Sequence, residues 1–178
     1  VLAGYQVVFV EQPKMAEELR AKGLRLDLTI DERRKTKDAN IIEPRFFVIE
    51  PSLENALKYG PFDAAIFALK SFDTISAMEG LKPFADKLPP LLCLSNGVDN
   101  EPTIANALGA DKVIYGTVTT AIGRRGSGSI ALEKLRGVGV AAGHPLSEKL
   151  VAALDKAYLK CVLYPDPLSM KWSKMLTN

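Results

Sequence analysis

The sequence contains few of the residues that mark specialised classes of protein. It has two cysteines and one histidine among 178 residues, and no apolar run reaches the ~18 residues that a membrane-spanning helix needs. Lysine and arginine (23) nearly balance aspartate and glutamate (21), so the charge pattern favours neither nucleic acid nor an anionic membrane as a partner. Cys93 and Cys161 lie in apolar runs without CxxC spacing. They are therefore expected to be buried thiols of an intracellular enzyme rather than zinc ligands or disulfide partners.

Several common catalytic motifs are also absent, because the sequence has no HExxH, no P-loop and no nucleophile elbow. His144 stands in a Gly-His-Pro segment ahead of a helix, without a carboxylate at triad spacing, and is interpreted as a turn residue at the helix entry. The glycine-rich segment 124–128 (RRGSG) lies between strands with no helix following it. It therefore predicts a hairpin turn rather than a phosphate-binding loop.

From residue 52 onward, helical and strand patterns alternate in the manner of repeated βα units. The predicted helices cover residues 52–59, 74–88, 102–108 and 145–158. The predicted strands cover residues 64–69, 91–95, 112–119, 116–122, 129–135, 138–141 and 159–164. Apolar runs without alternation, such as 64–69 and 91–94, are typical of strands buried on both faces. We therefore expect an α/β fold with a Rossmann-like, doubly wound parallel sheet.

The first 50 residues are less regular. Residues 1–4 resemble the last turn of a helix, so the chain is expected to begin inside an element, and a strand over 6–10 and a helix over 14–22 ending at Gly23 follow. Residues 24–30 and 46–49 predict two strands that could pair as an antiparallel insertion. The charged segment 31–38 between them is interpreted as a solvated loop.

Polar residues follow three of the predicted strands directly. Glu11, Lys70 and Asn96 stand where strands end, and ligands of open α/β sheets bind beyond the carboxyl ends of the strands. An acid at the end of the second strand of a dinucleotide fold can accept hydrogen bonds from ribose hydroxyls, so Glu11 favours NAD. Taken alone, each of the three could equally be a solvated loop residue.

The last helix carries a second candidate site. Asp166 and Pro167 predict its N-cap and first position, and an apolar stripe runs along Leu168, Trp172, Met175 and Leu176. Lys171, Lys174 and Asn178 gather beside this stripe, with the last two sharing a face. A lysine partly desolvated at an apolar margin can donate a proton, since burial lowers its pKa. The alternative is a lysine whose ammonium reaches water beside the helix.

Four segments containing these residues resemble the ketopantoate reductase family (2-dehydropantoate 2-reductases): ALKSFDT at 68–74, SNGVDNE at 95–101, GTVTTA at 116–121 and WSKMLTN at 172–178. The resemblance implies a Rossmann-like NAD(P)-binding domain over 1–165. Residues 166–178 would then be the first helix of an all-helical domain. The resemblance also leads us to expect the first strand and the glycine-rich phosphate loop to precede residue 1.

The resemblance further implies roles for particular residues. Lys70 and Asn96 would contact the nicotinamide cofactor or its neighbourhood, Lys174 would be the catalytic acid, and Asn178 would bind the substrate together with Lys174. Gln12 stands where family members tend to carry an arginine for the NADP phosphate. NADP is the cofactor that the family implies, and NAD, favoured by Glu11, stays open.

The implied reaction is the NADPH-dependent reduction of 2-dehydropantoate to pantoate, a step of pantothenate and coenzyme A biosynthesis. The resemblance implies a cytoplasmic enzyme with a small 2-keto acid as its partner, and it allows a homodimer. One alternative is a related reductase of another 2-keto acid. A non-catalytic dinucleotide-sensing domain on the same fold is a second alternative, because fold does not fix function.

Overall fold

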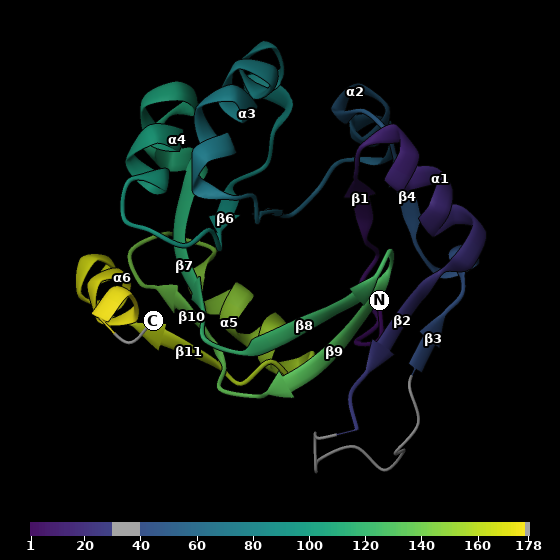
Figure 1. The fold of residues 1–178 in the computed structure, drawn as a ribbon. Coiled ribbons are helices and arrows are strands. Elements are labelled where there is room, and N and C mark those ends of the chain that lie inside the picture. The colour runs from purple at the N-terminus through teal and green to yellow at the C-terminus, as the bar shows by residue number, and fades with distance from the viewer. Residues whose placement is uncertain (30–39, 177–178) are drawn as a thin grey trace. The chain divides into compact units, whose positions relative to one another are not determined.

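The computed structural model describes residues 1–29 and 40–176 (Figure 1). The predicted loop 31–38 and Asn178 lie outside these described residues. The chain divides into two compact units, one made of Val1–Gly60 with Thr120–Arg136 and the other of Pro61–Thr119 with Gly137–Asn178. Each unit is described by itself. The predicted boundary between residues 165 and 166 concerns a following helical domain and stays a prediction.

The first unit holds two small sheets. In one, β1 (Val8–Val10) pairs in parallel with β4 (Val48–Glu50), with Val8 opposite Val48. The other has the order β3-β2-β9-β8. Its strands are β2 (Leu24–Asp27), β3 (Asn40–Ile42), β8 (Ala121–Gly126) and β9 (Ser129–Lys134). Strands β8 and β9 are antiparallel neighbours, which confirms the hairpin predicted at RRGSG.

The predicted pairing of residues 24–30 with 46–49 is wrong. Strand β2 pairs with β3 and with β9, whereas β4 pairs with β1. The physical reason is burial, because Ile49 of β4 packs in a core with Ala16 and Leu19 of the helix α1 (Pro13–Lys22). Helix α1 ends at Gly23, as predicted, where a φ of 73° closes the last turn and the Gly23 N–H donates to the Leu19 carbonyl at 2.8 Å.

The second unit contains a five-stranded sheet in the order β11-β10-β7-β6-β5 (Figure 1). Strands β5 (Ala65–Phe67), β6 (Leu91–Cys93) and β7 (Val113–Val118) are parallel neighbours. Strand β10 (Val138–Ala141) runs antiparallel to β7 and parallel to β11 (Cys161–Tyr164). The parallel strands with helical crossovers confirm the α/β, Rossmann-like fold class.

Helices cover both faces of this sheet. On one face, the fully buried side chains of Leu92, Ile114 and Val140 pack against Leu150 and other residues of α5 (Ser147–Lys156). On the other face, α6 (Pro167–Leu176) contacts β7 and β10. Helix α6 lies close to β10 at Gly139, where an added Cβ would be only 3.0 Å from the sulfur of Met170. Glycine at position 139 therefore leaves the space in which α6 docks.

Several predicted bounds shift for local reasons. Strand β6 is fully buried, as predicted, but Ile66 of β5 is 60% exposed because β5 ends the sheet. Helix α3 (Thr74–Leu81) continues as a 3-10 helix over Lys82–Lys87 rather than running unbroken to residue 88, since Pro83 removes a helical N–H. The predicted strand over 116–122 is wrong, because its residues divide between β7 and β8.

Among the remaining helices, α2 has a side-chain cap. Helix α2 (Leu53–Ala56) begins after Ser52, whose hydroxyl accepts the Asn55 N–H at 3.3 Å, and a 3-10 helix over Leu57–Tyr59 follows. Helix α4 (Asn100–Leu108) begins two residues before the predicted start. A short 3-10 helix over Pro44–Phe46 leads into β4, and two more precede α3 and β7 at Ser71–Asp73 and Ala110–Lys112.

Candidate functional site

The ends of β5 and β6 are tied together by a buried serine. The Ser95 hydroxyl, 4% exposed, donates to the Leu69 carbonyl at 2.8 Å, and the Leu94 N–H donates to the Phe67 carbonyl at 2.8 Å. These bonds place Lys70 and Asn96, the next residues of the two segments, at the same edge of the sheet. Both residues are exposed. They are therefore available to a ligand bound beyond the strand ends.

A second buried pair fixes the turn that follows Asn96. The Asn100 side chain donates to the Asn96 carbonyl at 2.7 Å and accepts the Thr74 hydroxyl at 2.7 Å. Thr74 and Asn100 are the first residues of α3 and α4 and are almost completely buried. The backbone of Asn96 is thus held by both helices while its side chain faces solvent.

Helix α6 starts as the sequence predicts. The Ser169 N–H donates to the Asp166 carboxylate at 2.7 Å, and the hydrogen bonds from Ser169 lower the pKa of Asp166. Pro167 occupies the first helical position. The start of the helix is therefore set by its own residues.

Helix α6 turns Met170 and Lys171, rather than its apolar stripe, towards the protein interior. The apolar stripe is exposed, with Trp172 at 51%, whereas Met170 and Lys171 are buried. Lys174, which follows Lys171 by three residues on the same face, is half-buried. The buried part of the helix thus includes a lysine, and the partners of Lys171 explain how it can be buried.

Lys171 fills all three of its ammonium donors inside the protein. Its Nζ lies 2.7 Å from Glu101 Oε1, 2.8 Å from the Ser95 carbonyl oxygen and 3.2 Å from the Gly116 carbonyl oxygen. Glu101 is 0% exposed and Lys171 is 3% exposed. A buried charge is tolerated only when it is paired and hydrogen-bonded, and here the pairing permits an inward-facing lysine.

The pair lies in a strongly desolvated environment. Burial raises the pKa of Glu101, and the Lys171 ammonium opposes that rise. Burial, with the negative charge of Glu101, raises the pKa of the neighbouring Cys93 thiol to about 12. Among the described residues, Glu101 Oε2 has no hydrogen-bond partner. The cluster is therefore a structural anchor for α6 whose charges are sensitive to substitution.

Glu11 and Gln12 belong to the other unit. Glu11 is exposed directly after β1, and its N–H donates to the Glu50 carbonyl at 3.1 Å. Gln12 is exposed at the start of α1, where its carbonyl accepts the Ala16 N–H. Both residues follow a strand, as predicted. That they share one crevice with Lys70 and Asn96 stays a prediction, because those two lie in the second unit.

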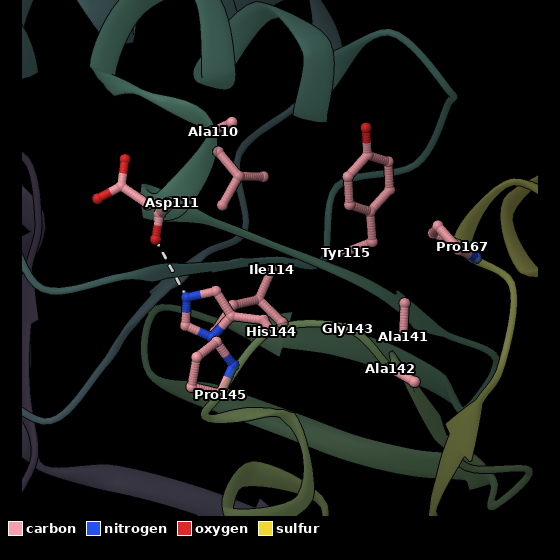
Figure 2. A pocket seen from close by; sticks show the side chains of 11 residues that line it. Ala110, Asp111, Ile114, Tyr115, Ala141, Ala142, Gly143, His144, Pro145 and Pro167 are labelled. Carbon is pink, nitrogen blue, oxygen red and sulfur yellow. Dashed lines mark hydrogen bonds between the residues drawn. The ribbon is translucent and has the colours of Figure 1, made fainter.

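A cavity of about 480 Å³ lies in the second unit at the amino end of β7, between Asp111, Tyr115 and His144 (Figure 2). None of the predicted site residues lines it. The His144 ring joins two segments, since Nδ1 lies 3.1 Å from the Leu146 backbone nitrogen and Nε2 lies 3.1 Å from the Asp111 carbonyl oxygen. An acceptor Nδ1 and a protonated Nε2 satisfy both bonds. The role predicted for His144, a turn residue at the helix entry, is confirmed.

Metal and membrane features were searched over residues 1–29 and 40–176. No group of three or more histidine, cysteine, aspartate or glutamate side chains in that part of the chain could hold a metal ion. None of its helices combines the length and the apolar character that crossing a membrane would require. Cys93 and Cys161 are free thiols, as predicted, the first buried and the second half-buried.

Comparison with known proteins gives a consistent assignment. A family model described as "Ketopantoate reductase PanE/ApbA" matches residues 1–143, whereas no curated protein matches the chain. Among solved structures, a PanE/ApbA family ketopantoate reductase from Ralstonia eutropha is 22% identical with a TM-score of 0.80. The alignment covers 99% of this chain and 54% of that one.

Two further structures have the same fold. A 2-dehydropantoate 2-reductase from Geobacter metallireducens is 22% identical with a TM-score of 0.77, covering 99% of this chain and 56% of that one. A D-mandelate dehydrogenase, solved with NADH and anilino(oxo)acetate, is 17% identical with a TM-score of 0.73, covering 97% and 54%. The chain thus spans about half the length of these solved proteins. Because the family model matches most of its residues, the chain belongs to the ketopantoate reductase family.

Proposed function

We propose that this chain is the cofactor-binding part of an NADPH-dependent reductase that converts 2-dehydropantoate to pantoate, a step of pantothenate and coenzyme A biosynthesis. The observation that carries the proposal is the docking of α6, whose buried Lys171 bonds to the Ser95 carbonyl after β6 and to the Gly116 carbonyl within β7, in a chain of this family. That docking brings the helix of Lys174 to the edge where Lys70 and Asn96 stand.

The donor groups at this edge suit a nicotinamide dinucleotide. The ammonium of Lys70 and the amide of Asn96 are exposed, and their backbones are tied together through Ser95 and Leu69. They can bind the hydroxyl, carbonyl and phosphate oxygens of such a cofactor. When bound, the reduced cofactor supplies a hydride to the C2 carbonyl of the substrate.

Lys174 supplies the proton in the proposed reaction. Its ammonium would donate to the carbonyl oxygen as that atom gains negative charge, and its positive charge would stabilise the forming alkoxide. Because Lys174 is half-buried on the docked face of α6, its charge acts in a medium that screens it less than bulk water does. Asn178, four residues later and outside the described residues, would hold the 2-keto acid.

The direct test is turnover by the complete protein with NADPH and 2-dehydropantoate, followed as loss of NADPH absorbance. Lys174→Ala should lower turnover by about 10²- to 10⁴-fold, the usual worth of general acid catalysis, with little change in NADPH affinity. Lys149→Ala is the matched control, because Lys149 is an exposed lysine of the same unit paired with Asp63. Asn178→Ala should mainly weaken 2-keto acid binding. Near-normal turnover in Lys174→Ala would refute the role of this lysine.

The choice of cofactor has its own test. Glu11 at a strand end favours NAD, whereas membership of the family favours NADP. The affinities of the complete protein for NADPH and NADH should be compared with those of Glu11→Ala. Removing the carboxylate should shift the preference towards NADPH, because a negative charge repels the 2′-phosphate. An unchanged ratio would mean that Glu11 does not contact the ribose.

A substrate panel distinguishes the alternatives. A protein that reduces an aryl 2-keto acid or another 2-keto acid faster than 2-dehydropantoate would be a related reductase with a different substrate. Binding of NADPH without reduction of any 2-keto acid would instead indicate a dinucleotide-sensing domain. Both outcomes keep the fold and the cofactor site and reject only the proposed reaction.

A further inference from the structure

The starting observation is that Lys171, buried beneath α6, connects three separate parts of the second unit. Its ammonium bonds to Glu101 of α4, to the Ser95 carbonyl after β6 and to the Gly116 carbonyl within β7. No other lysine of the described residues is buried. These bonds of a single side chain constrain both the position of α6 over the sheet and its rotation about the helix axis.

Stability alone does not account for this arrangement. Taking two charges out of water is costly, and apolar residues of similar volume usually hold a helix equally well or better. Met170, the neighbour of Lys171 on the same buried face, shows that this interface accepts an apolar side chain. Unlike apolar contacts, hydrogen bonds are directional, and the three bonds of Lys171 at 2.7 to 3.2 Å define one orientation of the helix.

The bonds of Lys171 end beside the residues proposed to act on cofactor and substrate. The Ser95 carbonyl precedes Asn96, and the Ser95 hydroxyl binds the carbonyl that precedes Lys70. Lys174 stands three residues further along the same face of α6. We propose that Lys171, held by Glu101, is a positioning residue that sets the place of Lys174 relative to Asn96 and Lys70. The catalytic part of this inference rests on the proposed function.

The experiment compares Lys171→Met with the double variant Lys171→Met/Glu101→Leu in the complete protein. The single variant leaves Glu101 buried without a partner and is expected to lose stability. The double variant removes both charges and should regain the unfolding midpoint of the wild-type protein. Turnover per NADPH-binding site should nevertheless stay about 10²-fold below wild type in the double variant, because small displacements of a catalytic group cost that much. NADPH affinity should change little, and Lys149→Met should match wild type.

The single tryptophan gives a readout that is independent of activity. Trp172 follows Lys171 directly on α6 and is half-exposed, so its acrylamide quenching reports how firmly the helix is held. Quenching should increase in the folded double variant and stay unchanged in Lys149→Met.

The outcomes separate the two proposals. A double variant that regains turnover together with stability, or that keeps wild-type quenching, overturns the positioning role. If the wild-type protein reduces no 2-keto acid, the proposed function fails. The quenching of Trp172 then decides by itself whether Lys171 orients α6.

Discussion

Removing the Lys171 ammonium is the perturbation whose effect on stability the structure defines best. Lys171→Met leaves the Glu101 carboxylate and the carbonyls of Ser95 and Gly116 without the donor that they now share. Because both members of the ion pair are almost completely buried, the loss approximates the breaking of a buried salt bridge. We expect the free energy of unfolding to fall by about 3–5 kcal/mol.

The loss of stability in Lys171→Met should grow as the pH rises. Burial raises the pKa of Glu101, and Lys171 opposes that rise, so the pKa of Glu101 should climb further in Lys171→Met. When the pKa of a carboxyl group is higher in the folded state than in the unfolded state, its full contribution to stability is present at pH values below the unfolded-state pKa. That stability is lost as the pH rises through the folded pKa. The variant should therefore become less stable from about pH 4.5 upwards, where the glutamate of the unfolded chain ionises.

Urea unfolding followed by Trp172 fluorescence measures this directly, since Trp172 lies on the same helix as the substituted residue. Wild type, Lys171→Met, Glu101→Leu and the double variant form a thermodynamic cycle. Each single variant should be markedly less stable than wild type, and the double variant close to it. A Lys171→Met protein with the wild-type midpoint at neutral pH, or one that gains stability as the pH rises, would refute this account of the buried pair.

Three further predictions follow from local packing and burial. Gly116→Ala should lower the free energy of unfolding by about 1–3 kcal/mol, because its Cβ would lie 2.7 to 2.9 Å from three neighbouring atoms. The control is Gly80→Ala, which has open space in α3 and should raise the free energy of unfolding by about 0.4–1 kcal/mol. Gly23→Ala should lower the melting temperature, since its φ is +73° and its Cβ would lie 2.5 Å from a carbonyl oxygen; an unchanged melting temperature would contradict the strain. Alkylation at pH 8 should be slow for Cys161 and slower for Cys93, because burial raises their pKa values to about 11 and about 12, and fast labelling of the folded protein would contradict this.

Much of the fold could be predicted because its signals are local. The alternation of apolar runs and helical segments after residue 52 indicated the βα units, Gly23 marked the end of α1, and Asp166 with Pro167 marked the start of α6. Each element is indicated by residues that are close to one another in the sequence. Strand pairing in the first unit has no such signal. The partner of β4 is β1, some 40 residues earlier, and it is selected by the shared burial of Ile49 beneath α1.

The orientation of α6 could not be predicted for a related reason. Its apolar stripe has the spacing of a buried helix face, and the pattern places Lys171 only beside that stripe. Lys171 is buried instead of the stripe because Glu101, 70 residues earlier in the sequence, provides a negative charge that pairs with the Lys171 ammonium. No spacing in the sequence links two residues so far apart. The pattern indicates Lys174 as a candidate site residue and contains no signal that singles out Lys171.

The residues of the candidate site that the sequence analysis did not identify are buried polar side chains. Lys70 and Asn96, which we propose to contact the cofactor, were predicted because they follow strands, and both are exposed. The residues that hold this edge in place, Ser95, Asn100, Thr74 and Lys171, are buried polar side chains, each bonded to a backbone or side-chain partner. A loop that must present an exposed side chain in one orientation needs such buried bonds beneath it, because solvent-facing contacts alone leave the loop mobile. A polar residue at the end of an apolar strand, such as Ser95 after Leu91–Cys93, therefore indicates a strand end that is anchored from beneath, and its exposed neighbour is the candidate to contact a ligand.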